Sequence, residues 1–99
     1  MTVSEWLQQE INVKRKWLRP RATCADGFTV SIQASEYHYS KPSLNDAESY
    51  THVELGYPSA AEDALMSYAE SSDRPTGTVY GYVPIEVAEQ VVAAHGGIV

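Results

Sequence analysis

The chain has 99 residues, of which 43% are hydrophobic and 20% are charged, and its formal net charge is -6. This composition is typical of one globular domain and excludes a disordered chain, and the absence of any run of about 18 apolar residues excludes a membrane-spanning segment. We therefore expect a single domain, residues 1–99, that has no signal peptide and stays in the cytoplasm.

The first predicted element is a short helix over residues 3–12. Residues 2–5, TVSE, have the pattern of a capping box, in which the first and last side chains each accept a hydrogen bond from the other residue's backbone amide. Apolar residues then recur at helical spacing. Pro20 bars the helix from extending past about residue 18, because proline has no amide and restricts the residue before it.

A β-hairpin is predicted next. Asp26-Gly27 favours a two-residue turn between strands over residues 21–25 and 28–35, and the second of these strands alternates apolar and polar residues. Cys24, the single cysteine, excludes an internal disulfide and is expected to act as a small apolar residue. A third strand is predicted over residues 50–57, after a polar link.

The second half of the chain predicts two helices and one strand. Residues 59–62, SAAE, form a second capping-box pattern that begins a helix over residues 60–70, and residues 78–83 form a fourth strand. Pro84 suits the first position of a last helix, which Gly96 and Gly97 end. The order α-β-β-β-α-β-α predicts an α+β fold: a mostly antiparallel four-stranded sheet with helices packed on a face.

One polar cluster could bind a metal ion if the second and third strands paired symmetrically about Asn45. Glu36 would then face Glu54, and His38 would face His52, which gives two carboxylates and two imidazoles for zinc or manganese. The symmetry alone supports this register, and a bulge near residue 35 is needed to turn these side chains outward.

We favour the alternative, a solvated polar face in which Tyr37 and Tyr39 pack inward. The sequence has no nucleophile elbow, no paired cysteines and no phosphate-binding glycine loop, so we expect neither an enzyme nor a cofactor.

The charge is unevenly distributed along the chain. Residues 1–21 carry five cations and two carboxylates, whereas residues 22–99 carry two cations and eleven carboxylates, so the net charges are +3 and -9. The stretch KRKWLRPR, residues 14–21, has the cations and the indole of a single-strand binder, but the acidic remainder would repel phosphates. Direct nucleic-acid binding is therefore not expected. We expect Trp17 and Leu18 to anchor in the core, and the basic end leaves pairing with a second copy open.

The acidic residues are the other candidate surface, because an array of carboxylates resembles the phosphates of a nucleic acid. Exposed tyrosines supply rigid contact area with a polar tip and are common at interfaces. The candidate partner-binding carboxylates are Asp46, Glu48, Glu54, Glu62, Asp63, Glu70, Asp73, Glu86 and Glu89. The candidate aromatic contacts are Tyr37 and Tyr39 in the first place, with Tyr50, Tyr57, Tyr80 and Tyr82 as further tyrosines of which some must belong to the core.

Three blocks resemble a family of small proteins found in bacteriophages and prophages of Gram-positive bacteria: residues 19–42 (RPRATCADGFTVSIQASEYHYSKP), 50–59 (YTHVELGYPS) and 78–97 (TVYGYVPIEVAEQVVAAHGG). The resemblance includes the spacing between the blocks, but it supplies no catalytic motif. It implies a mobile-element setting, in which small acidic domains such as anti-CRISPR proteins bind host machinery.

The expectation is therefore a phage-encoded, non-enzymatic inhibitor that binds a host CRISPR-Cas effector, or another defence protein, through an acidic surface that mimics nucleic acid. The alternative is a phage accessory protein that binds nucleic acid or a metal.

Overall fold

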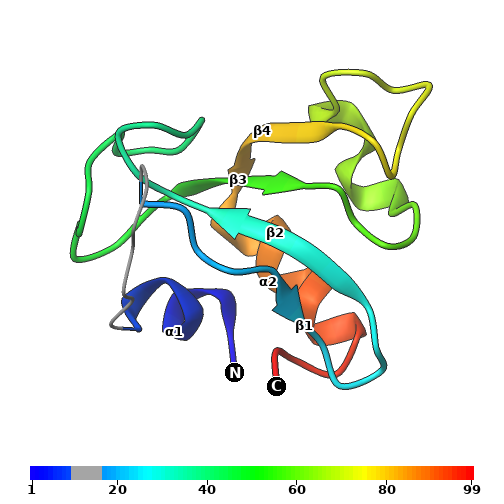
Figure 1. The fold of residues 1–99 in the computed structure, drawn as a ribbon, viewed down its shortest axis with the longest axis horizontal. Helices are drawn as coiled ribbons and strands as arrows, with labels where there is room; N and C mark the ends of the chain where they lie inside the picture. The colour runs from blue at the N-terminus through cyan, green and yellow to red at the C-terminus, as the bar shows by residue number, and fades with distance from the viewer. Residues whose placement is uncertain (10–16) are drawn as a thin grey trace.

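The computed structural model describes residues 1–9 and 17–99 (Figure 1). The four strands form one antiparallel sheet in the order β1-β2-β3-β4, so each strand pairs with its neighbour in sequence. The predicted α+β class with a four-stranded antiparallel sheet is confirmed. In chain order the elements are α1 (Val3–Gln8), β1 (Ala22–Thr23), β2 (Thr29–Gln33), β3 (His52–Gly56), the 3₁₀ helix η1 (Asp63–Tyr68), β4 (Val79–Pro84) and α2 (Ile85–Ala94).

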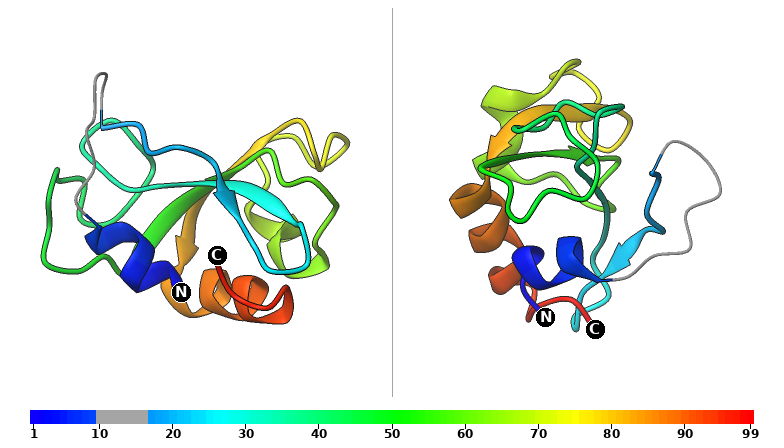
Figure 2. Two further views of the ribbon diagram at one scale, coloured as in Figure 1. Left: turned by 60° about the horizontal axis from the view of Figure 1, so that its bottom comes forward. Right: turned by 90° about the vertical axis from the view of Figure 1, so that its left-hand side faces the viewer.

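Both α-helices cover the same side of the sheet. α2 packs against β3 and β4, and α1 packs beside α2, as Figure 2 shows from two further directions. The core lies between the sheet and these helices. The largest fully buried side chains of the core include Val3, Val30, Ile32, Val53, Leu55, Leu65, Tyr80 and Val83.

No helix of the described residues is long and apolar enough to cross a membrane.

α1 begins as the sequence predicts and ends earlier. The Thr2 hydroxyl accepts from the Glu5 amide at 3.1 Å, and the Glu5 carboxylate accepts from the Thr2 amide at 2.8 Å, so the capping box is confirmed. The helix stops at Gln8 because the backbone of Gln9 is extended. Residues 10–12 of the predicted helix lie outside the described residues.

The first hairpin is confirmed, but its turn is one residue longer than predicted. The Gly27 amide donates to the Cys24 carbonyl at 2.9 Å, so Ala25 and Asp26 are the central residues of the turn. Gly27 follows with a φ of 95°, a left-handed conformation that glycine adopts without strain. Cys24 itself is buried, as expected.

The predicted helix over residues 60–70 is wrong in type and start. The segment forms the 3₁₀ helix η1, and Glu62, which precedes it, makes no side-chain capping bond. Both members of the expected capping box have other partners: the Ser59 hydroxyl accepts from the Thr29 amide at 2.9 Å, and Glu62 contacts His95. Tertiary contacts have therefore replaced the local cap.

The last helix, α2, starts one residue later than predicted. Pro84 ends β4 and precedes the helix instead of occupying its first position. The stop is as predicted, since Gly96 and Gly97 have φ values of 89° and 84°.

Candidate protein-interaction surface

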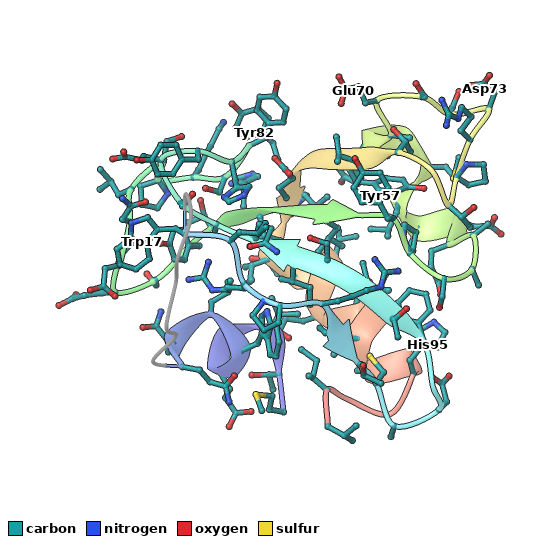
Figure 3. All side chains as sticks on the ribbon, in the orientation of Figure 1. Trp17, Tyr57, Glu70, Asp73, Tyr82 and His95 are labelled. Carbon is teal, nitrogen blue, oxygen red and sulfur yellow. The ribbon has the colours of Figure 1, made fainter. Side chains whose placement is uncertain are left out.

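Two exposed tyrosine rings lie together at the outer edge of the sheet. Tyr82 belongs to the edge strand β4, and Tyr39 belongs to the link between β2 and β3. Their ring centroids are 5.7 Å apart with the planes tilted by 44°, and the two residues are 45% and 51% exposed. Figure 3 shows Tyr82 pointing away from α1 and α2 into solvent. Each of the two residues is therefore about half exposed, and the pair presents aromatic area to solvent at this edge of the sheet.

The position of Tyr39 is fixed by its backbone. Its amide donates to Oε2 of Glu54 at 2.8 Å, and its carbonyl accepts from the Tyr82 amide at 3.0 Å. The side chain crosses β4 at Gly81, where an added Cβ would lie 3.2 Å from Cβ of Tyr39 and 3.4 Å from its Cδ2. Any larger residue at position 81 would therefore push the tyrosine away from the strand.

A recess of about 310 Å³ lies beside this pair. η1 contributes Tyr68 to it, and the chain that follows η1 is tied to the strand by the hydrogen bond from the Glu70 amide to the Val79 carbonyl at 3.0 Å. The recess is thus built from the edge strand and two segments that pack against it. Its lining residues are Tyr39, Tyr68, Glu70, Val79, Gly81 and Tyr82.

Two of the exposed tyrosines have left-handed backbone conformations. Tyr57 and Tyr82 each have a φ of 50°, a region that costs a bulky residue on the order of 1–2 kcal/mol. Such residues persist where the surrounding structure holds them, and they gather at binding sites. The surroundings of Tyr57 include the Thr78 carbonyl, which accepts from its amide at 3.0 Å, and the Arg21 guanidinium, which donates to its carbonyl.

The candidate tyrosines divide between surface and core. Tyr37, Tyr39, Tyr57 and Tyr82 are exposed, so the expected inward packing of Tyr37 and Tyr39 is wrong. Tyr50 and Tyr80 are buried, and their hydroxyls donate to backbone carbonyls of Leu44 and Pro75.

The candidate carboxylates are spread over four parts of the chain. Asp46 and Glu48 lie in the link between β2 and β3, Glu54 lies on β3, Glu86 and Glu89 lie on α2, and the rest lie in η1 or in the segments beside it. Figure 3 shows Glu70 and Asp73 in the loop that leads from η1 into the start of β4. The nine residues therefore come from separate elements and share no single helix, strand or loop.

Three of these carboxylates hold the fold together. Glu54 accepts from the Tyr39 amide, and Glu62 contacts Nε2 of His95. Glu89 accepts from the amides of Val3 and Ser4 at 2.6 and 3.2 Å and so caps α1 from the neighbouring helix. Each carboxylate has an internal partner that a sequence pattern does not display.

The symmetric strand pairing behind the metal hypothesis is wrong. β2 pairs with β3 as Gln33 with Glu54, and His52 pairs with Lys41 and with Pro84. Nδ1 of His38 lies 2.6 Å from the Ser35 hydroxyl, and burial lowers the pKa of this imidazole. No group of three or more potential metal ligands occurs within residues 1–9 and 17–99.

The basic stretch is placed differently from its expected arrangement. Leu18 is 58% exposed and Trp17 is partly exposed, whereas Arg19 is only 4% exposed. The Arg19 guanidinium donates to the carbonyls of Ala34 and Leu7 at 2.8 and 3.2 Å. Lys14, Arg15 and Lys16 lie outside the described residues.

A second cluster of ionisable groups surrounds His95, at the end of α2. Its Nδ1 lies 2.6 Å from Oδ2 of Asp26, its Nε2 contacts Oε1 of Glu62, and its ring stacks on Phe28 with centroids 3.9 Å apart. The hydrogen bonds to Glu62 and Asp26 raise the pKa of His95. We call this cluster the His95 clasp. It joins the first hairpin, the approach to η1 and the end of α2, and its ring nitrogens are both occupied.

Comparison with models of protein families, with curated proteins and with solved structures found no match to this chain. The site is therefore defined by its own geometry. Sequence reasoning selected Tyr39 and Glu70 separately and did not connect them with Gly81 or Tyr68. The one available signal was the run TVYGYV, in which a glycine interrupts a strand between two tyrosines, a pattern that marks a close approach to the backbone.

Proposed function

We propose that this chain is a non-enzymatic protein-binding domain that inhibits a host defence complex, with a CRISPR-Cas effector as the partner we favour. In this proposal it is phage-encoded and acts in the cytoplasm of the bacterial host. The exposed Tyr39–Tyr82 pair carries the proposal, because rigid aromatic anchors dominate the binding energy of protein interfaces.

Two further observations support a protein partner. Glycine at position 81 and the left-handed backbone of Tyr82 hold the rings in place before any partner arrives, which reduces the entropy lost on binding. The net charge of -6 favours approach to a basic surface, such as the positively charged channel in which an RNA-guided effector holds its heteroduplex.

The scattered carboxylates change which surface we favour. Mimicry of nucleic acid needs charges that follow one line, whereas three of the nine candidates are bound within the fold. We therefore place the aromatic pair at the centre of the contact and the exposed carboxylates of the loop after η1 at its margin.

The test combines phage survival with direct capture. Hosts with an active CRISPR system are challenged with phage carrying or lacking the gene, and the tagged chain is used to capture the purified effector. We expect protection and capture with the natural chain and loss of both in Tyr39→Ala/Tyr82→Ala. Tyr37→Ala is the matched control, since Tyr37 is also 51% exposed but does not line the recess. Equal plaque numbers with and without the gene, together with no capture, would refute the proposal.

A further inference from the structure

We infer that the recess beside Tyr39 and Tyr82 receives a cationic side chain, an arginine or a lysine, of the protein that this chain binds. The inference rests on the proposed function and names the chemistry of the contact. Its basis is the composition of the lining, the size of the recess and the charge around it.

The lining combines aromatic faces with one carboxylate. Three of the six lining residues are tyrosines, one is Glu70, and Val79 and Gly81 of β4 complete it without a positive charge. Tyrosine rings attract cations through their negative faces, and a carboxylate adds direct charge attraction. A neutral or anionic ligand would gain neither the cation–π attraction nor the attraction to the carboxylate.

One of these rings already holds a cation of its own chain. Nζ of Lys41 lies 5.5 Å from the centroid of Tyr82, within the range of a cation–π contact. Lys41 does not line the recess. The Tyr82 ring is therefore oriented so that an ammonium reaches it, while the recess itself is left for a cation from outside.

The size of the recess favours a side chain over a larger ligand. Its volume of about 310 Å³ lies at the lower end of the range for small-molecule pockets. A guanidinium is planar, stacks on aromatic faces and is weakly hydrated, so arginine matches this lining better than the more strongly hydrated ammonium of lysine.

The surrounding charge supports the same occupant. The loop after η1 carries two carboxylates, Glu70 and Asp73, against one cation, Arg74, and residues 22–99 have a net charge of -9. This field attracts a basic partner surface and lowers the local concentration of anions. Charge complementarity thus selects a protein that offers arginine or lysine side chains.

A titration of the isolated chain tests the inference. Amide chemical shifts are followed by NMR while Nα-acetyl-arginine amide is added, and the neutral Nα-acetyl-citrulline amide, which has nearly the same shape, is the matched probe. We expect shifts at Glu70, Gly81 and Tyr82 with the arginine probe alone. Tyr39→Leu or Tyr82→Leu should weaken binding about three- to tenfold, the effect of losing one cation–π contact. Glu70→Gln should weaken binding and reduce its dependence on salt.

Tyr37→Leu is the control variant and should bind the probe as the natural chain does. Equal shifts with citrulline, or no shifts up to the solubility limit of the arginine probe, would overturn the inference. The amide spectrum of each variant reports whether it is folded. No partner protein takes part in this titration, so a negative result would overturn the cation-binding recess and not the proposed inhibitor function. A negative phage assay would overturn the inhibitor function and not the recess.

Discussion

Arg19 is the residue whose environment departs furthest from its chemical type. This charged side chain of the stretch KRKWLRPR lies inside the protein, while the neighbouring Leu18 is exposed. Its guanidinium donates to the carbonyl of Leu7, near the end of α1, and to the carbonyl of Ala34, directly after β2. Its amide donates to Oε1 of the buried Gln33 at 2.8 Å. Arg19 thus connects α1 with the end of β2.

Arg19→Ala should destabilise the protein by about 2–4 kcal/mol, because it leaves two buried carbonyls without a donor and opens a cavity. Arg74→Ala is the control and should cost about 1 kcal/mol or less, since Arg74 is exposed in the loop after η1. Urea unfolding followed by tryptophan fluorescence measures both. Similar losses for the two variants would contradict the structural role of Arg19.

The His95 clasp predicts how stability depends on pH. The pKa of His95 is raised in the folded protein, so its contribution is fully present below the unfolded value of about 6.5 and is lost as pH rises through the folded value. We expect the free energy of unfolding to fall as pH rises above about 6.5.

His95→Gln should remove most of this slope, which urea unfolding at several pH values measures. His52→Gln is the control and should retain the slope. His38, whose pKa burial lowers, gives a slope of opposite sign that is confined to pH values below about 6.5. A slope that survives in His95→Gln would assign the pH dependence to another group.

At the scale of elements, α1 depends on a carboxylate from another helix. α1 has only six residues, too few to be stable alone, and Glu89 of α2 accepts from the amides at its first turn. Glu89→Gln should destabilise the protein by about 1 kcal/mol, because it weakens a charged cap at the positive end of the helix. Hydrogen exchange at the Val3 and Ser4 amides should become faster. Glu86→Gln, at an exposed position in the first turn of α2, is the control and should leave exchange at the Val3 and Ser4 amides unchanged.

Those elements whose signals are local could be predicted from the sequence. The capping box of α1, the strand alternation in β2 and the glycines that end α2 depend on neighbours in the chain, and all are confirmed. The helix over residues 60–70 failed because Ser59 and Glu62 bond to residues far away in sequence. A local pattern carries no information about such competition.

The candidate site could likewise be predicted only in the parts that depend on local sequence. Tyr39 was predicted both to pack inward and to form an exposed contact, because period-two alternation cannot describe the link after β2, which follows no strand geometry. The meeting of Tyr39 and Tyr68 beside Gly81 depends on two segments, distant in sequence, folding onto one strand edge. A single sequence does not show that these segments lie close together in the fold.

At the scale of the whole molecule, the carboxylates of η1 and of the loop after it should contribute more to partner binding than those elsewhere. Asp63→Asn/Glu70→Gln/Asp73→Asn removes three charges of this region, which includes the lining residue Glu70, and Asp46→Asn/Glu48→Gln/Glu86→Gln removes three charges of the link after β2 and of α2, none of which lines the recess. Effector capture and its salt dependence should weaken in the first variant and change little in the second. Equal weakening would indicate that only the total charge matters.

The His95 clasp also joins residues that lie far apart in the sequence. Its two ends, Asp26 and His95, are 69 positions apart, so the chain must close a long loop before the contact forms. The first hairpin leaves the ribosome well before α2, and during that interval Phe28 has no imidazole to stack on. The packing of Phe28 in the first hairpin therefore depends on the last helix of the chain, because the ring on which it stacks belongs to the residue that ends that helix.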